Sequence, residues 1–227
     1  PIVDIFYSCG SQKTGADGSD NFPCTWASDG DQYVVGGDGF GFGENLPKSD
    51  WFLSRIDGSY DGYSTADLYN RPTGEGGKVY GIVGMGSHVY LAAGMSSSSV
   101  GGSMGDAMHV CYIRKHTLSG NFDKQDNFCN GWDDEVFLPG FVQMGENLEY
   151  AFDDYVYAFS VWGTNQANGT PYFDIQRVDA TTYTENIGAG WGVAGNKSVV
   201  FLIRILRSYL EVPDTGRDKW EWFNGDW

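Results

Sequence analysis

Short runs of alternating apolar and polar residues dominate the chain and predict an all-β protein. In runs such as 32–37 (QYVVGG) and 88–94 (HVYLAAG), every second side chain falls on one face of a strand. Glycine-rich turns separate these runs, and helix signals are nearly absent. The predicted strands are 2–7, 32–37, 51–57, 78–84, 88–94, 109–115, 154–163, 172–179 and 199–210.

An internal repeat favours a β-propeller over a β-sandwich. An apolar strand with a tyrosine and a terminal glycine recurs around Tyr33, Tyr90 and Tyr157. Each is followed by a strand built around an arginine, namely Arg55, Arg114 and Arg177. The repeat spacing of roughly 60 residues suits a blade of four strands. We therefore expect a single propeller domain over 1–227.

The charge balance excludes two classes of partner. The formal net charge is -16, with only 14 Lys and Arg residues, whereas nucleic acids and anionic membrane surfaces need clustered cations. The longest apolar run, 199–210, is interrupted by Arg204 and Arg207, so no membrane insertion is predicted. A neutral glycan or a cation suits this chain better. The plain alternative is that the charge only confers solubility.

The cysteines and one sequon indicate a secreted protein. The four cysteines are Cys9, Cys24, Cys111 and Cys129. They lack the C-x-x-C spacing of zinc and redox sites, which favours two disulfides. The sequence-near pairs Cys9–Cys24 and Cys111–Cys129 are preferred among the three connectivities that four cysteines allow. Asn196 begins a glycosylation sequon, and a first residue Pro1 instead of Met is consistent with a removed signal peptide. The expected location is extracellular.

The segment 25–43 (TWASDGDQYVVGGDGFGFG) is interpreted as a hairpin with a ligand-facing end. A phosphate-binding loop is excluded, because no helix pattern follows the glycines. The Asp29-Gly30 pair is typical of a tight turn, so the acidic residues there serve the turn. Asp38 ends the second strand between glycines that leave room for a ligand. Pairing of the two strands brings Asp20 to the same end.

Two carboxylates that converge on one cleft are the arrangement that glycoside hydrolysis needs. One, protonated, assists the leaving group, and the other, ionised, activates water or attacks the anomeric carbon. Asp20 and Asp38 are therefore the candidate catalytic pair, with the two roles unassigned; the alternative is a pair of solvated loop aspartates. Further candidates for substrate binding are the carboxylates of Glu44, Asp153 and Asp154. The indole ring of Trp26 is a candidate for stacking on a sugar ring. Their structural alternatives are turn capping for the aspartates and core packing for the tryptophan.

Several segments together resemble the domain-of-unknown-function 4185 family, part of which is glycoside hydrolase family 183, the endo-D-arabinanases. The resemblance is carried by 19–39 (SDNFPCTWASDGDQYVVGGDG), 77–94 (GKVYGIVGMGSHVYLAAG), 139–160 (PGFVQMGENLEYAFDDYVYAFS), 175–185 (IQRVDATTYTE) and 219–227 (KWEWFNGDW). It implies a five-bladed β-propeller, secretion and endo-acting cleavage of a furanose-containing polysaccharide. It also implies that Asp20 and Asp38 are the catalytic pair.

Two departures from the family favour a different function. Phe152 stands where family members carry an arginine, and the chain is short for five full blades. The alternative is therefore a non-catalytic glycan-binding protein, or a structural subunit that self-assembles outside the cell. No cofactor is expected, and the oxygen-rich segments 15–21 and 131–135 make calcium the alternative.

Overall fold

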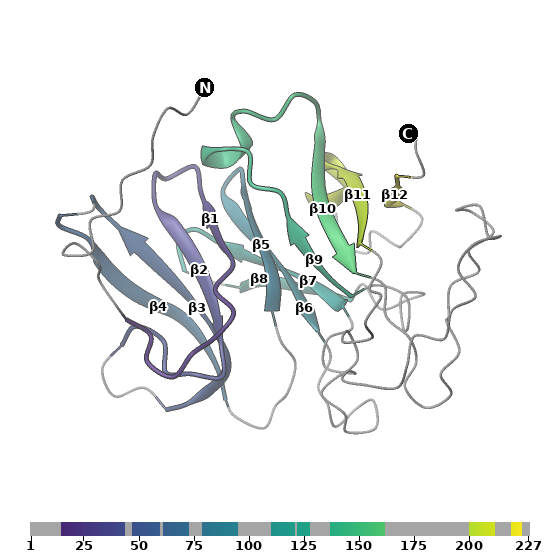
Figure 1. Cartoon of the computed structure of the whole chain (residues 1–227). Coiled ribbons are helices and arrows are strands. Elements are labelled where there is room, and N and C mark those ends of the chain that lie inside the picture. The colour runs from purple at the N-terminus through teal and green to yellow at the C-terminus, as the bar shows by residue number, and fades with distance from the viewer. Residues whose placement is uncertain are drawn as a thin grey trace, which may run out of the picture.

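The chain folds into antiparallel β-sheets (Figure 1). The structure is a computed structural model that describes residues 15–43, 47–59, 61–72, 79–94, 110–120, 122–127, 137–161, 200–211 and 219–223. Within these residues the fold is mainly β, as the alternating pattern predicted. The helices in this part of the chain are too short and too polar to cross a membrane.

The described strands form three sheets of four strands each, and in every sheet the strands follow one another in chain order. The first sheet contains β1 (Cys24–Trp26), β2 (Gln32–Gly37), β3 (Ser49–Asp57) and β4 (Ser64–Pro72). The second contains β5 (Val79–Met85), β6 (His88–Gly94), β7 (Val110–Thr117) and β8 (Phe122–Asn127). The third contains β9 (Phe137–Phe141), β10 (Tyr155–Val161), β11 (Val200–Leu206) and β12 (Glu221–Trp222).

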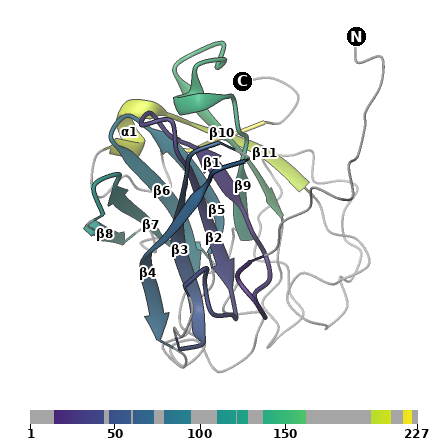
Figure 2. The same ribbon diagram turned by 90° about the vertical axis from the view of Figure 1, so that its left-hand side faces the viewer.

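Two short helical elements accompany the third sheet. The 3-10 helix η3 (Glu146–Leu148) lies between β9 and β10, and α1 (Arg207–Glu211) follows β11 directly. The Arg207 guanidinium donates to the carbonyl of Leu148 at 3.4 Å, and Figure 2 shows both elements at the same end of the molecule. The predicted strand 199–210 was therefore wrong beyond Leu206, where the chain turns into a helix.

The predicted strands succeed where a continuous face is buried and fail at the edges of the sheets. Segments 32–37 and 88–94 coincide with β2 and β6. Four edge strands were not predicted, namely β4, β8, β9 and β12. The sequences of β4 and β8, STADLYNRP and FDKQDN, lack a continuous apolar face, whereas β9 (FLPGF) contains a proline and β12 has only two residues. The predicted strands 2–7 and 172–179 lie outside the described residues.

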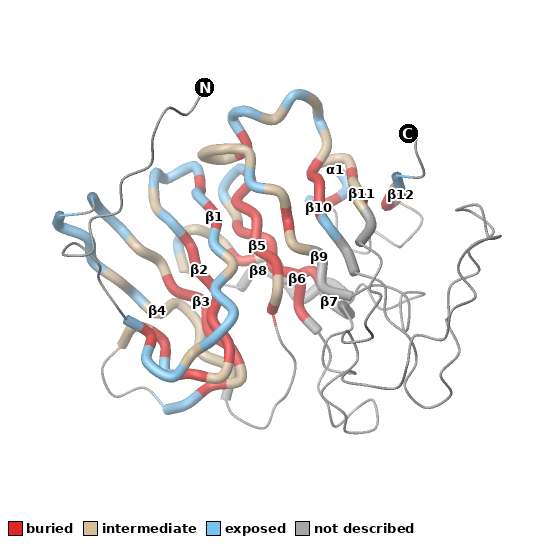
Figure 3. The backbone as a smooth tube through the Cα atoms, viewed as in Figure 1, coloured by how far each residue is buried: buried red, intermediate tan, exposed pale blue. Residues whose placement is uncertain are grey.

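Strand β5 supplies side chains to two hydrophobic cores. It contacts β1 and β2 of the first sheet as well as β9 of the third. Ile82 belongs to the cluster shared with the first sheet, whereas the next residue, Val83, belongs to the cluster shared with the third. This division arises because successive side chains of a strand point to opposite faces. Figure 3 shows β5 buried along nearly its whole length.

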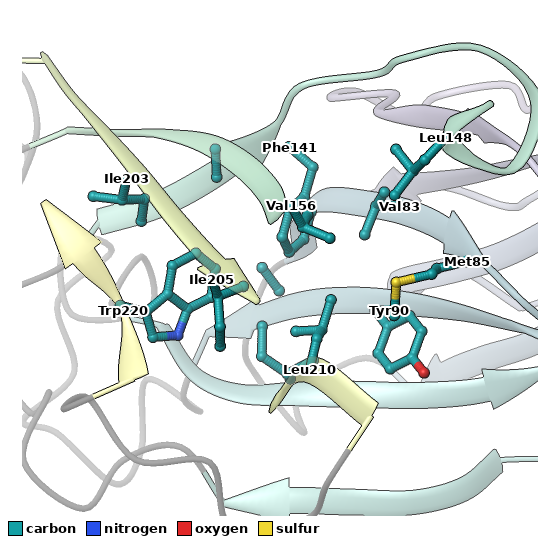
Figure 4. Packing of buried hydrophobic residues seen from close by; sticks show 13 residues of the cluster. Val83, Met85, Tyr90, Phe141, Leu148, Val156, Ile203, Ile205, Leu210 and Trp220 are labelled. Atoms are coloured by element: carbon teal, nitrogen blue, oxygen red, sulfur yellow. The ribbon is translucent and has the colours of Figure 1, made fainter. Parts of the chain in front are cut away.

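The cluster between the second and third sheets is drawn in Figure 4. Side chains of β10 and β11 face those of β5 and β6, and Leu210 of α1 and Trp220 also belong to the cluster. The buried members are Val83, Met85, Tyr90, Ala92, Ile113, Phe141, Leu148, Val156, Ala158, Ile203, Ile205, Leu210 and Trp220.

A polar network joins the first strands of neighbouring sheets, with the Thr25 hydroxyl and the Gly84 amide buried and Gln143 exposed. The Thr25 hydroxyl of β1 accepts a hydrogen bond from the Gly84 amide of β5 at 2.8 Å and donates to Gln143 Oε1 at 2.7 Å. Gln143 Nε2 in turn donates to the carbonyl of Ile82 at 2.7 Å. Glycine at position 84 permits this close approach, since a Cβ there would lie 3.1 Å from the Cα of Ala27 and 3.1 Å from the Trp26 carbonyl oxygen.

Replacement of Thr25 by valine tests this network. Thr25→Val keeps the shape of the side chain but leaves the buried amide of Gly84 and the carbonyl oxygen of Gln143 without the hydroxyl. We expect the free energy of unfolding, measured with urea, to fall by roughly 1–3 kcal/mol. Thr65→Val, at a half-exposed position of the edge strand β4, is the matched control with a change below about 0.5 kcal/mol. Equal losses in both variants would contradict the role of Thr25.

Candidate functional site

Asp20 and Asp38 lie together at the end of the first sheet that is opposite its β1–β2 turn. Asp20 pairs with Gly37: the Asp20 amide donates to the Gly37 carbonyl at 2.8 Å, and the Asp20 carbonyl accepts from the Gly37 amide at 2.7 Å. The Asp20 carboxylate lies over Gly37, with Oδ1 2.9 Å from the position that a Cβ of that residue would take. Asp38 is the next residue along the chain. The hairpin thus brings the two aspartates to one end, and their catalytic roles remain a prediction.

Asp38 has an unusual backbone conformation for a residue with a side chain. Its φ is 55°, in the left-handed region, and its amide donates to the carbonyl of Asp50 at 3.2 Å. The next residue, Gly39, accepts hydrogen bonds from the Ser49 amide at 2.8 Å and from the Ser49 hydroxyl at 3.0 Å. Non-glycine residues with left-handed backbone angles cluster at functional sites. Such a residue persists only where the surrounding contacts offset the strain.

Tyr80 is a third member of this site, and the sequence analysis did not single it out. The register between β5 and β6 shifts between Val79 and Gly81, so Tyr80 is the extra residue of a β-bulge. Bulges re-aim side chains and occur often beside active sites. The Asn21 amide group donates to the Val79 carbonyl at 3.4 Å, which ties the segment after Asp20 to this bulge.

The electrostatics of Tyr80 connect it to both aspartates. Burial raises the pKa of the Tyr80 phenol first, and the negative charges of Asp20 and Asp38 raise this pKa further. The phenol therefore remains protonated throughout the physiological pH range and offers a hydrogen-bond donor close to two carboxylates. The only sequence signal for Tyr80 was its position in the segment 77–94 that resembles the family; a tyrosine in an apolar run otherwise indicates core packing.

The other end of the sheets is closed by hydrogen bonds between turns. The Ser28 hydroxyl, in the β1–β2 turn, donates to the Gly86 carbonyl of the β5–β6 turn. The Gly86 amide donates to Asn147 Oδ1 of η3 at 2.7 Å. We call this region, made of the two turns and the segment from Gly145 to Asp154, the hairpin end. Figure 1 shows it at the top of the molecule.

Three predicted substrate-binding residues lie at the hairpin end, away from Asp20 and Asp38. Trp26 is half-exposed, and its indole donates to the Gly30 carbonyl at 3.0 Å. Asp153 caps the start of β10, where it accepts from the Tyr155 amide at 3.0 Å and from the Tyr157 hydroxyl at 2.6 Å. Asp154 is exposed. The structure therefore does not bring these three residues to the Asp20–Asp38 site.

The hairpin end repeats one motif in the first and third sheets. Asp29 accepts from the amide two residues later at 3.2 Å and from the Tyr33 hydroxyl at 2.8 Å, as Asp153 does with Tyr155 and Tyr157. Burial and the charge of the hydrogen-bonded aspartate raise the pKa of Tyr33 in the first sheet and of Tyr157 in the third. The cross-strand neighbours of Tyr33, Tyr90 and Tyr157 are Arg55, Lys115 and Arg204.

The arginine repeat predicted from the sequence is confirmed in the first sheet and is wrong in the second. Arg55 lies opposite Tyr33, as the repeat requires, and forms an ion pair with Asp31 at 3.4 Å. Arg114 pairs with Leu91 instead of Tyr90, so the repeat is one residue out of register there. Arg177 lies outside the described residues, and Arg204 takes the position opposite Tyr157.

The remaining predicted sites fall largely outside the described residues. Cys24 is exposed, and the described part of the chain contains no disulfide. Both pairings stay predictions, because Cys9, Cys129 and the side chain of Cys111 are not described. Glu44 and Asn196 are also outside. Among the described residues, no group of three or more His, Cys, Asp or Glu side chains could hold a metal ion.

Comparison with known proteins adds no relative. No family model matches the chain, and no curated protein matches it. Any assignment of function therefore depends on the residues of this chain and on the segments that resemble the family.

The strain at Asp38 predicts an unusual order of stability between two variants. Asp38→Gly and Asp38→Ala both remove the carboxylate, but only alanine keeps a Cβ at a φ of 55°. We expect the glycine variant to have the larger free energy of unfolding, by about 1 kcal/mol. At Asp50, within strand β3, the order should reverse, because glycine destabilises a strand interior by roughly 0.5–1 kcal/mol relative to alanine. Urea unfolding of the four variants measures both differences, and the same order at both positions would contradict strain at Asp38.

Proposed function

We propose that the protein is an extracellular, endo-acting glycoside hydrolase that cleaves a furanose-containing polysaccharide of the arabinan type. The observation that carries this proposal is the convergence of Asp20, Asp38 and the protonated phenol of Tyr80 at one end of the first two sheets. A pair of carboxylates is the minimal catalytic apparatus of most glycosidases. The sequence segments that resemble the endo-D-arabinanases include all three residues.

The fold that we propose for the whole chain is a β-propeller of five compact blades. Three successive four-stranded meanders, with β5 in contact with β1 and β9, are consistent with blades arranged side by side. The tyrosine on the second strand of each sheet, opposite a basic residue on the third, supports a repeated unit. The number five comes from the family resemblance.

The proposed reaction assigns the chemistry to the carboxyl groups. The protonated carboxyl group donates its proton to the glycosidic oxygen, and the ionised one attacks the anomeric carbon or deprotonates a water molecule that does so. The Tyr80 phenol donates a hydrogen bond to a sugar oxygen or to the ionised carboxylate. Because Tyr80 carries no charge, it can do so without neutralising the carboxylate that must act as base or nucleophile.

The second candidate function is a non-catalytic subunit of an extracellular assembly. Two large aromatic side chains at the hairpin end favour it, since Tyr150 and Phe152 are 75% and 76% exposed. Exposed aromatic side chains are enriched in surfaces that bind other proteins. An enzyme acts at the Asp20–Asp38 end, whereas this alternative would use the opposite end of the sheets.

Sugar release from a panel of arabinans and arabinogalactans tests the proposed enzyme. We expect Asp20→Asn and Asp38→Asn to lower kcat at least roughly a hundredfold, because each removes a proton donor or acceptor. Tyr80→Phe should lower kcat roughly tenfold or more, since one hydrogen-bond donor is lost. Asp61→Asn, which removes an exposed carboxylate from the β3–β4 turn, is the control and should leave kcat unchanged.

The outcomes separate the two candidate functions. Activity that survives either asparagine substitution removes that residue from the mechanism. If the wild type releases no sugar from any substrate, the enzyme proposal fails for this panel. Self-association that is abolished by Phe152→Ser would then support the structural subunit.

A further inference from the structure

The loop that follows Asp38 is wrapped around a carboxylate on a different strand. Asp67, in the edge strand β4, accepts a hydrogen bond from the Phe42 amide at 3.1 Å and one from the Gly43 amide at 2.6 Å. The Ser54 hydroxyl of β3 donates to the same oxygen as Phe42. Hydrogen bonds to an ionised acceptor are stronger than those between neutral groups, so this carboxylate is a firm anchor for the loop.

Gly41 allows the loop to approach this carboxylate. Its φ is 73°, and a Cβ at this position would lie 2.9 Å and 3.0 Å from the two carboxylate oxygens of Asp67. Any other residue would therefore combine a strained backbone with a steric clash. The glycine-rich run after Asp38 is thus shaped for Asp67, which explains one of its glycines without a ligand.

The position of Asp67 depends on an irregularity in the sheet. The register between β3 and β4 shifts after Leu53, so that Leu53 lies opposite Tyr69 while Ser54 lies opposite Asp67. The extra residue, Leu68, packs against the core of the first two sheets. The bulge therefore places Leu68 against the core and leaves Asp67 directly across from Ser54.

The segment from Asp38 to Gly43 is held along its length, and in its middle the Phe40 amide donates to the Asp17 carbonyl at 3.4 Å. At its start, the Asp38 amide donates to Asp50 and the Gly39 carbonyl accepts from Ser49, both in β3. At its end, the amides of the last two residues donate to Asp67. The carboxylate of Asp67 already accepts hydrogen bonds on both oxygens, so it acts through the loop and has no role as a proton donor to substrate.

We propose that Asp67 is a positioning residue that fixes the loop after Asp38 and thereby orients the Asp38 carboxylate. The catalytic consequence rests on the function proposed above, whereas the structural part, that Asp67 holds the loop, does not. A small displacement of a reacting group is costly, since a misplacement of about 1 Å can reduce a rate roughly a hundredfold.

Amide hydrogen exchange measured by NMR tests the structural part. Asp67→Asn replaces one carboxylate oxygen by a side-chain NH2 group, which cannot accept a hydrogen bond. At least one of the Phe42 and Gly43 backbone amides therefore loses its acceptor. We expect that amide to exchange at least roughly tenfold faster than in the wild type. The amide of Val35 in β2, which donates to the Pro23 carbonyl at 3.0 Å, should be unchanged and so reports that the sheet is intact. Unchanged exchange at both loop amides would overturn the proposal.

A second variant reaches the same loop without touching the carboxylate. Gly41→Ala introduces the clash with Asp67 and should accelerate exchange of the same amides. Its matched control is Gly62→Ala, in the β3–β4 turn, where nothing lies within 4 Å of the added Cβ. For Asp67→Asn, the control is Asp61→Asn. Accelerated exchange in the controls as well would contradict a specific role of Asp67.

Kinetics then test the consequence for catalysis. On a substrate that the wild type cleaves, Asp67→Asn should lower kcat roughly tenfold to a hundredfold with little change in KM, because the reacting group and not the sugar contacts is displaced. An unchanged kcat with accelerated loop exchange would overturn the positioning role. If the wild type cleaves no substrate, the proposed function fails, while the exchange experiment still decides whether Asp67 holds the loop.

Discussion

The close approach of β1, β5 and the segment after β9 is the constraint on which the rest of the structure depends. At Gly84 two backbones come together with no side chain between them, and the polar groups trapped there are satisfied by the Thr25 hydroxyl and the Gln143 amide. A buried polar group without a partner is costly, so the hydrogen bond between the Thr25 hydroxyl and the Gly84 amide favours this arrangement of β1 and β5. That arrangement divides the side chains of β5 between two cores and sets the sheets side by side.

The two ends of the sheets are held together by different kinds of contact. At the hairpin end, the turns are tied to one another, and Tyr33 and Tyr157 are hydrogen-bonded to aspartates. At the other end, the chain contains left-handed residues, a bulge at Tyr80 and a loop shaped around Asp67. Left-handed non-glycine residues occur at both ends, since Asn147 and Leu148 of the hairpin end have φ values of 51° and 60°. The Asp38 end differs in combining such a residue with a bulge and with a loop shaped around a carboxylate, and a rigid frame must offset this local irregularity.

The part of this arrangement that could be predicted from the sequence follows from local patterns. The alternation in β2 and β6 reveals a buried face, and the Asp29-Gly30 turn fixes the register that brings Asp20 beside Asp38. Tyr80 and Asp67 could not be predicted, because each owes its position to a β-bulge, where an extra residue breaks the period-two pattern. The edge strand β4 escaped because it lacks a continuous apolar face. The helix α1 was predicted as part of a strand, because its apolar residues continue those of β11.

The division of the β5 side chains between two cores has a consequence for how the protein unfolds. In an array of repeats that touch only their neighbours, each unit contributes its own stability and one end can fray while the other persists. Here Ile82 and Val83 belong to different cores but to one strand, so that strand cannot leave one core and remain in the other. The first and third sheets, which share few direct contacts, are thus coupled through β5. Loss of either sheet exposes one face of that strand, and we therefore expect the three described sheets to unfold together.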